Sequence, residues 1–274
     1  MRLDGRKVLI TGAGSGIGRA LAVEAARRGA IIVLSGRNEA ALRETAALTG
    51  RPADTHLLPL DLADQSARQE IAVRVQELIG GLDVLVNNAG VVEAGPVQDI
   101  DDDSLRHLFE IDLLAPISLT RCLLPLLRQA KAGQVINVGS MFGDIAFPFF
   151  AAYSAAKFGL RGWSDALRRE VDSAGIRVTY CAPRGTRTPA VQSFSAYVAP
   201  FAMRLDEPEQ VARRIADAIE SGARDLYPAG PERLFLWVQK LFPGAIDGGL
   251  RKKAARAAGV SSVRLPSGSA SILP

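Results

Sequence analysis

Short apolar runs alternate with stretches of helical periodicity along most of this 274-residue chain. Six runs rich in Val, Ile and Leu predict buried strands, at 7–12, 31–36, 55–61, 83–90, 134–140 and 176–183. The segments between them carry apolar residues at helical spacing, including a long helix over 102–131 that we expect to be interrupted at Pro116 and Pro125. Strands alternating with helices predict an α/β fold: a single doubly wound, Rossmann-like domain, its parallel sheet covered by helices on both faces.

The C-terminal part continues this pattern and then changes. A helix over 208–221, a short strand at 225–230 and an apolar segment at 232–242 follow the sixth strand. We expect the domain to span 1–249, with a substrate loop at 184–206. Residues 250–274 turn basic and then rich in Ser, Gly and Pro, which predicts a flexible tail.

Composition argues against several classes of function. The chain is 48% hydrophobic and 23% charged, with neither a signal peptide nor a run long enough to span a membrane, which favours a cytoplasmic location. Its net charge of +4 comes from Arg residues scattered among acids, so no nucleic-acid partner is expected. Cys122 and Cys181 lie in apolar runs as expected for buried thiols, and with only His56 and His107 available no metal site is expected.

Tyr153 and Lys157 are the first candidate for catalysis. Their four-residue spacing at the head of a predicted helix places both side chains on one face. A nearby cation favours the phenolate, and this lowers the pKa of a tyrosine toward the range in which it can act as an acid or base. Ser140 precedes Tyr153 by thirteen positions and directly follows the fifth predicted strand. The spacing alone also occurs by chance on solvent-exposed helices.

A glycine-rich turn, TGAGSGIG at 11–18, connects the first strand to the first helix. Gly12, Gly16 and Gly18 allow a tight turn, the approach of a phosphate to backbone N–H groups, and close packing of helix on strand. The turn therefore predicts a dinucleotide site, although a plain glycine turn is the alternative.

The second and third strands end in residues that bear on the choice of cofactor. Arg37 follows the second strand where a carboxylate would select a free ribose hydroxyl, so the sequence favours the 2′-phosphate of NADP over NAD. A solvated surface arginine is the alternative. Asp61 and Leu62 end the third strand, where Asp61 could bind the adenine amino group, cap the next helix, or do both.

With Asn87-Asn88-Ala89-Gly90 and Pro183-Arg-Gly-Thr-Arg-Thr188, these motifs resemble the short-chain dehydrogenase/reductase family over about residues 3–230. The resemblance implies that Tyr153 is the general acid in reduction and the base in oxidation. It also implies that Ser140 binds the substrate oxygen and that Lys157 binds the nicotinamide ribose and lowers the Tyr153 pKa.

The resemblance also implies the cofactor's surroundings. Asn87 and Ala89 would shape the floor of the site, and Thr188 would lie near the carboxamide. The full set of cofactor-binding residues expected from the turn, the strand ends and the resemblance is Gly12, Gly14, Ser15, Gly16, Ile17, Gly18, Arg37, Asn38, Asp61, Leu62, Asn88, Ala89, Gly90, Tyr153, Lys157, Pro183, Gly185, Thr186 and Thr188.

Two positions depart from the family pattern. Asp112 stands where the family usually has the asparagine of a proton relay, so we include it among the catalytic residues. If the relay uses the backbone carbonyl of this residue, Asp112 changes little. If it uses the side chain, a carboxylate there would stabilise the Lys157 ammonium and reduce its effect on Tyr153. Arg184 separates Pro183 from Gly185, where the family commonly has Pro followed directly by Gly.

Aromatic residues gather in the two loops that should hold the substrate. Phe142, Phe147, Phe150 and Phe194 are the candidate pocket residues, which favours a lipophilic carbonyl compound or alcohol. Lid packing or a subunit interface is the alternative. The family suggests a homodimer or homotetramer. The apolar and basic segment 231–253 could contact a membrane surface or pack on the protein.

We therefore expect an NADP-dependent carbonyl reductase or alcohol dehydrogenase. One alternative is a non-catalytic NADP-binding sensor or scaffold on the same fold. Another is a sugar-nucleotide epimerase or dehydratase, against which the short segment after Thr188 argues, because such enzymes need a larger substrate domain.

Overall fold

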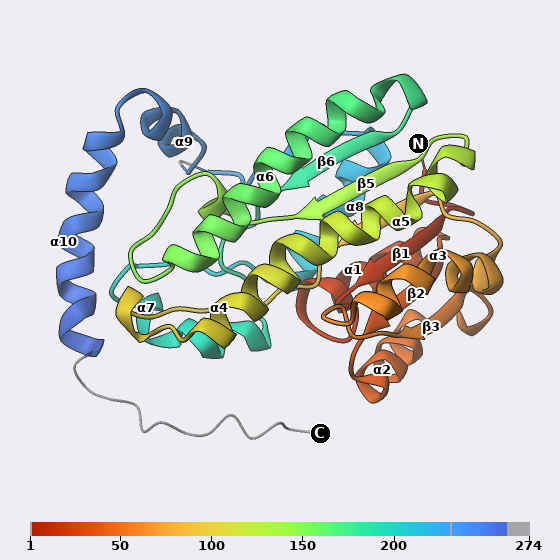
Figure 1. Cartoon of the computed structure of the whole chain (residues 1–274), viewed down its shortest axis with the longest axis horizontal. Helices are drawn as coiled ribbons and strands as arrows, with labels where there is room; N and C mark the ends of the chain where they lie inside the picture. The colour runs from red at the N-terminus through yellow and green to blue at the C-terminus, as the bar shows by residue number, and fades with distance from the viewer. Residues whose placement is uncertain (1, 231, 262–274) are drawn as a thin grey trace.

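A computed structural model describes residues 2–230 and 232–261, and within them seven parallel strands form one sheet in the order β3-β2-β1-β4-β5-β6-β7. The predicted α/β, doubly wound, Rossmann-like fold is confirmed (Figure 1). The strand order changes direction between β1 and β4, which is where ligands bind in open sheets of this kind. The strands are β1 Lys7–Thr11, β2 Ile31–Gly36, β3 Thr55–Pro59, β4 Val84–Asn87, β5 Gln134–Val138, β6 Arg177–Cys181 and β7 Asp225–Leu226.

Helices cover both faces of the sheet. Apolar residues of α1 and α8 pack on one face, and those of α3, α5 and the end of α6 pack on the other. The helices are α1 Gly16–Arg27, α2 Glu39–Thr49, α3 Gln65–Ile79, α4 Asp102–Phe109, α5 Ala115–Gln129, α6 Ala151–Val171, α7 Ser195–Val198, α8 Pro208–Ser221, α9 Glu232–Leu241 and α10 Pro243–Ser261.

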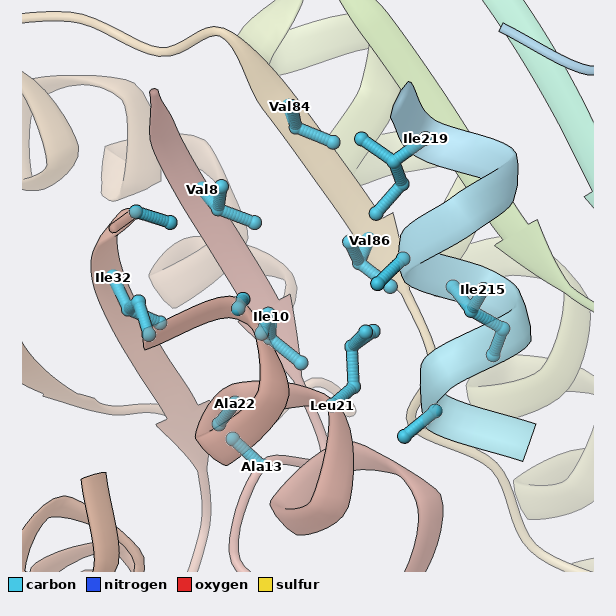
Figure 2. Close-up of a cluster of buried hydrophobic side chains, with 14 of the residues drawn as sticks. Val8, Ile10, Ala13, Leu21, Ala22, Ile32, Val84, Val86, Ile215 and Ile219 are labelled. Atoms are coloured by element: carbon cyan, nitrogen blue, oxygen red, sulfur yellow. The ribbon is translucent and has the colours of Figure 1, made fainter. Parts of the chain in front are cut away.

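The core follows from alternation along the strands. Val8 and Ile10 of β1 belong to the cluster under α1 and α8, whereas Leu9 belongs to the cluster on the other face. Figure 2 shows the first cluster, where Leu21 of α1 and Ile215 of α8 lie over β1 and β4. Both faces of the sheet are therefore buried, as its nearly continuous apolar strands require.

The long helix expected over 102–131 is interrupted directly before Pro116. A single π-helical turn, η3 (Glu110–Leu114), separates α4 from α5. Pro116 lies in the first turn of α5, where a missing N–H is tolerated, and Pro125 lies inside that helix. The break expected at Pro116 therefore lies just before that residue, whereas the break expected at Pro125 does not occur. The inserted turn leaves Asp112 fully buried while Leu114 is exposed to solvent.

The boundary expected at residue 249 falls inside a helix. Helix α10 begins at Pro243, a residue suited to a first helical position, and runs to Ser261. Ala257 of this helix is buried in an aromatic cluster on α6 and α7. Residues 250–261 are thus helical, and the rest of the expected tail, 262–274, lies outside the described residues. In the part of the chain that the structure describes, no helix has the length and hydropathy needed to cross a bilayer.

We expect Ile215→Ala to lower the free energy of unfolding by about 2–5 kcal/mol, because it opens a cavity between α8 and the sheet. Chemical denaturation would measure this loss. Val73→Ala is the matched control: Val73 is exposed, so its truncation should leave stability nearly unchanged. Equal effects of the two changes would contradict the packing described for α8.

Candidate active site

A cavity of about 990 Å³ opens at the carboxyl ends of the strands, at the point where the strand order changes direction. It extends from the glycine-rich turn before α1, past Ser140 and Tyr153, to an aromatic cluster near α7. Every residue expected to bind cofactor lines this cavity except Gly18. The four candidate substrate residues line it as well. Sequence motifs far apart in the chain therefore meet in one space.

The glycine-rich turn forms one wall, and two of its glycines are required by both space and conformation. Gly12 has φ +65°, and a Cβ atom there would lie 2.8 Å from the Ala89 Cα. Gly16 has φ +53°, and a Cβ atom there would lie 2.9 Å from Thr188 Cγ2. Side chains at these positions would be strained and would fill the cradle at the N-terminus of α1.

Gly18 was expected to bind cofactor, but it lies behind the cavity wall. A Cβ atom on Gly18 would lie 2.2 Å from the Gly12 carbonyl oxygen and 2.6 Å from Asn88 Nδ2. Its role is therefore to let the first turn of α1 pack against the loop.

The two asparagines after β4 have different surroundings. Asn88 lines the cavity, and its amide donates to the carbonyl oxygen of Thr11 at 2.9 Å. Asn87, expected to shape the cofactor floor, is instead buried and donates to Asn137 Oδ1 at 2.8 Å. It therefore joins β4 to β5 inside the sheet and does not line the cavity.

The far end of the cavity is lined by Arg37, Asn38, Asp61 and Leu62. Arg37 is exposed there. Asn38 Oδ1 accepts from the Ala41 N–H and so caps α2. The alternative interpretation, in which Asp61 caps α3, was wrong, because the N-cap residue of α3 is Asp64. Asp61 Oδ1 instead accepts from the Ala63 N–H within a turn.

Tyr153 and Lys157 lie side by side on the first turns of α6, as their spacing predicts. The Lys157 ammonium nitrogen is 5.6 Å from the centroid of the Tyr153 ring, and both side chains are buried at the cavity wall. Ser140 lies opposite, at the start of η4 (Met141–Gly143), where its hydroxyl accepts from the Phe142 N–H at 3.1 Å. Three groups that can move or bind a proton thus converge in the cavity.

Asp112 forms a fully buried ion pair with Lys157. Its Oδ2 is 3.1 Å from the Lys157 ammonium, and its Oδ1 accepts from the Val91 N–H at 2.7 Å. A Cβ atom on Gly90 would lie 3.3 Å from Asp112 Oδ1, so this pair also fixes the loop after β4. The η3 turn supplies the carboxylate directly behind the lysine.

These contacts determine the direction of each pKa. Burial by itself would lower the pKa of Lys157, but the Asp112 carboxylate overcomes this and the pKa is raised. Burial raises the pKa of Tyr153; the Lys157 ammonium and a hydrogen bond with Ser140 lower it, and the Asp112 carboxylate raises it further. Asp112 therefore opposes the effect that Lys157 has on the phenol.

Tyr180 is a site residue that the sequence did not reveal. It lies on β6, fully buried, and its hydroxyl donates to the Ser140 carbonyl oxygen at 3.2 Å. Only glycines leave room for it: a Cβ atom on Gly139 or Gly143 would lie 2.3 Å from the Tyr180 side chain. The guanidinium of Arg161 lies over its ring, 4.8 Å from the centroid. Tyr180 therefore holds the backbone that carries the Ser140 hydroxyl.

Aromatic rings form the opposite end of the cavity. Phe142 stacks on Phe147 with centroids 4.6 Å apart and meets Phe150 at 4.9 Å. Both the pocket interpretation and the packing alternative hold in part. The four predicted residues line the cavity. Tyr197 and Phe201, both from the second loop, do not line it and pack in the same aromatic cluster.

The substrate loop is closed at its base. The Arg184 guanidinium pairs with the Asp206 carboxylate at 2.8 Å, and the Asp206 N–H donates to the Gly185 carbonyl oxygen at 2.8 Å. The departure from the family pattern at Arg184 thus ties the two ends of the loop together, while Gly185 and Thr188 still line the cavity.

The C-terminal helices supply lining residues that we did not predict. Phe235 of α9 lines the cavity, as do Ile246, Leu250 and Lys253 of α10. Lys253 also donates to the Phe201 carbonyl oxygen at 3.1 Å. The four-residue spacing of the apolar residues 246 and 250 could have predicted an amphipathic helix here. The basic run at 251–253 led us to expect a flexible tail instead. Among the described residues, no cluster of His, Cys, Asp and Glu side chains could hold a metal ion.

Comparisons with known proteins point to one family. A family model described as short chain dehydrogenase matches residues 6–198. The chain is 28% identical over 252 residues to ketoacyl reductase HetN of Nostoc sp., covering 89% of this chain and 88% of that protein. It is 34% identical over 253 residues to dehydrogenase/reductase SDR family member 7B of Bos taurus, covering 86% and 78%.

Two further likenesses extend along nearly the whole chain. Identity to estradiol 17-beta-dehydrogenase 11 of Macaca fascicularis is 30% over 253 residues, covering 91% of this chain and 83% of that protein. A crystal structure of a short-chain dehydrogenase from Streptomyces avermitilis superposes with a TM-score of 0.77 at 30% identity, covering 96% of this chain and 99% of that one.

We expect Asp112→Asn to move the pH–rate profile of alcohol oxidation to lower pH. The substitution removes the carboxylate that raises the Tyr153 pKa, so the phenolate form is reached at lower pH. Steady-state rates across the alkaline range would measure the shift, with thermal unfolding as a check on folding. An unchanged profile would contradict the coupling of Asp112 to Tyr153.

We expect Tyr180→Phe to lower kcat about tenfold, because Ser140 loses the contact that fixes its backbone. The dissociation constant of the cofactor should stay within about twofold. Tyr227→Phe is the matched control, since the Tyr227 hydroxyl belongs to the same polar cluster but donates to Asp144. If both variants lost activity equally, or neither did, the positioning role of Tyr180 would be refuted.

Proposed function

The chain belongs to the short-chain dehydrogenase/reductase family, and we propose that it is an NADP(H)-dependent oxidoreductase that interconverts a lipophilic ketone or aldehyde and its alcohol. The observation that carries this proposal is the meeting of Ser140, Tyr153 and Lys157 in the cavity that the glycine-rich turn opens. This is the arrangement needed to protonate a carbonyl oxygen as hydride reaches its carbon.

The chain's residues fit a dinucleotide. Gly12 and Gly16 keep the N-terminus of α1 accessible to a pyrophosphate, and Thr188 lies across the cradle from Gly16. The nicotinamide, when bound, supplies or accepts the hydride. Asn88, Ala89 and the loop after β6 would hold its ribose and ring.

The remaining chemistry is proton transfer by the protein. In reduction, the Tyr153 hydroxyl donates a proton to the developing alkoxide, and the Ser140 hydroxyl donates a second hydrogen bond to the same oxygen. The Lys157 ammonium stabilises the phenolate that remains. In oxidation, Tyr153 takes the proton back.

Arg37 is the reason for proposing NADP rather than NAD. It lies at the cavity wall after β2, and no acidic residue follows that strand before Glu39. A planar guanidinium binds a dianionic phosphate through charge-assisted hydrogen bonds.

The aromatic end of the cavity supports a lipophilic substrate. Phe142, Phe147, Phe150 and Phe194 line the cavity, as do Met141 and Met203, and the Phe142 ring lies 6.3 Å from the Tyr153 ring. The names of two relatives, a ketoacyl reductase and an estradiol dehydrogenase, agree with substrates that have an apolar body. We further propose a homodimer or homotetramer. The cytoplasmic location stays a prediction.

A turnover screen tests the proposal directly. Ketones, aldehydes and alcohols of increasing apolar size would be assayed with NADPH or NADP and, in parallel, with NADH or NAD. We expect turnover of apolar carbonyl compounds that Tyr153→Phe abolishes while NADPH binding is retained. Tight NADPH binding without turnover of any compound would favour the non-catalytic sensor instead.

We expect Arg37→Glu to weaken NADPH binding about 10–100-fold, as the loss of charge-assisted hydrogen bonds to a phosphate requires. NADH binding should change little. Arg43→Glu is the control, because Arg43 is exposed on the adjacent α2 and does not line the cavity. Titration of cofactor fluorescence would measure both, and an equal loss for NADH would contradict the phosphate-binding role.

A further inference from the structure

Helix α9 leaves an apolar stripe uncovered on the protein surface. Leu234, Trp237 and Leu241 are 65%, 66% and 65% exposed, and their spacing of three and four residues places them on one face. Phe242 extends the stripe and is 67% exposed. Leu236 lies on another side of the helix and packs against the buried cluster that contains Met141 and Tyr180. The helix is therefore anchored by one side and presents large apolar side chains on the other.

The same end of the molecule holds the chain's excess of positive charge. Residues 234–257, on α9 and α10, contain five of the 33 basic and one of the 29 acidic residues, which leaves 28 basic and 28 acidic residues in the rest of the chain. Lys240 of α9 is exposed, as are three basic residues of α10: Arg251, Lys252 and Arg256. The net charge of the chain is thus concentrated on α9, which carries the apolar stripe, and on α10, which contacts α9.

This surface adjoins the mouth of the cavity. Phe235, next in sequence to Leu234, lines the cavity and is also half exposed. Ile246 and Leu250 of α10 line it as well. In Figure 1, α9 and α10 lie together at the left end of the molecule, beyond the carboxyl ends of the strands.

We propose that α9 and the basic side chains of α10 dock this protein on the surface of an anionic lipid bilayer, with the cavity mouth toward the lipid. Exposed Leu, Trp and Phe beside Lys and Arg is the composition of a helix that lies in the plane of a membrane interface. The further step, in which the substrate passes from the lipid past Phe235 to Tyr153, rests on the proposed lipophilic substrate.

The positive charge of this surface favours an anionic bilayer over a second copy of the chain as its partner. In a two-fold dimer the same patch faces itself, so Lys240, Arg251 and Lys252 would approach like charges. An anionic headgroup layer attracts the same side chains, and its acyl boundary accepts the apolar stripe.

Vesicle binding in the absence of substrate tests the docking. Phosphatidylcholine vesicles with and without phosphatidylglycerol would be titrated into the full chain. The chain has two tryptophans, Trp163 and Trp237. In the Trp163→Phe variant, tryptophan fluorescence therefore comes from Trp237 alone. We expect a blue shift of its emission and co-sedimentation with the anionic vesicles, both reduced by added salt.

Two sets of variants separate the apolar and the charged contributions. Leu234→Ser/Trp237→Ser/Leu241→Ser should weaken co-sedimentation by about tenfold or more, because it removes the buried apolar area. Leu48→Ser/Val73→Ser/Val97→Ser, which changes comparably exposed residues elsewhere, should bind as the wild type does. Arg251→Gln/Lys252→Gln/Arg256→Gln should remove the preference for anionic over neutral vesicles.

Equal binding by the α9 triple variant and its control would overturn the proposal. So would a fall in the mass measured by light scattering for the α9 variant, which would assign this face to contact between copies. None of the three α9 residues lines the cavity, so turnover of a water-soluble carbonyl compound should be unchanged. Failure of the proposed reaction would appear as absent turnover with vesicle binding intact, and is thereby distinguishable from failure of the docking.

Discussion

A buried ion pair between the Lys157 ammonium and the Asp112 carboxylate holds the reaction centre together. Neither charge is stable alone in the interior, since an unpaired buried charge costs about 3–5 kcal/mol. Their pairing joins α6 to the η3 turn, and through the Val91 N–H it also joins the loop after β4. Three segments that supply the cavity wall are therefore fixed by one electrostatic requirement.

The same helix extends this arrangement away from the cavity. Tyr153, Lys157 and Arg161 are spaced by four residues along α6 and form one polar stripe. Arg161 stacks on Tyr180, pairs with Asp225, and its pKa is raised by that hydrogen bond against the effect of burial. Tyr180 in turn contacts the Ser140 backbone. One face of α6 thus places the proton donor and, through a chain of contacts, the hydroxyl opposite it.

Much of this could be predicted from the sequence because the signals are local. The strands follow apolar runs to within a few residues, and the four-residue spacing of Tyr153 and Lys157 is a property of any helix. The remainder depends on tertiary packing. Gly18 and Gly16 look alike in the motif, yet Gly18 packs against the Gly12 carbonyl oxygen whereas Gly16 lines the cavity. The η3 turn, the fit of Tyr180 between two glycines and the helical course of 250–261 arise only when distant segments meet.

The loop that begins at Arg184 and ends at Asp206 is fastened where it leaves and rejoins the fold. Because its ends are held side by side, a change in its length costs little additional closure entropy. Between those ends, Thr188 faces Gly16 of the glycine-rich turn, and Phe194, Tyr197 and Phe201 share a buried cluster with Tyr153 of α6. A change confined to the residues between these contacts would therefore reshape the cavity while the attachment of the loop at its base stays the same.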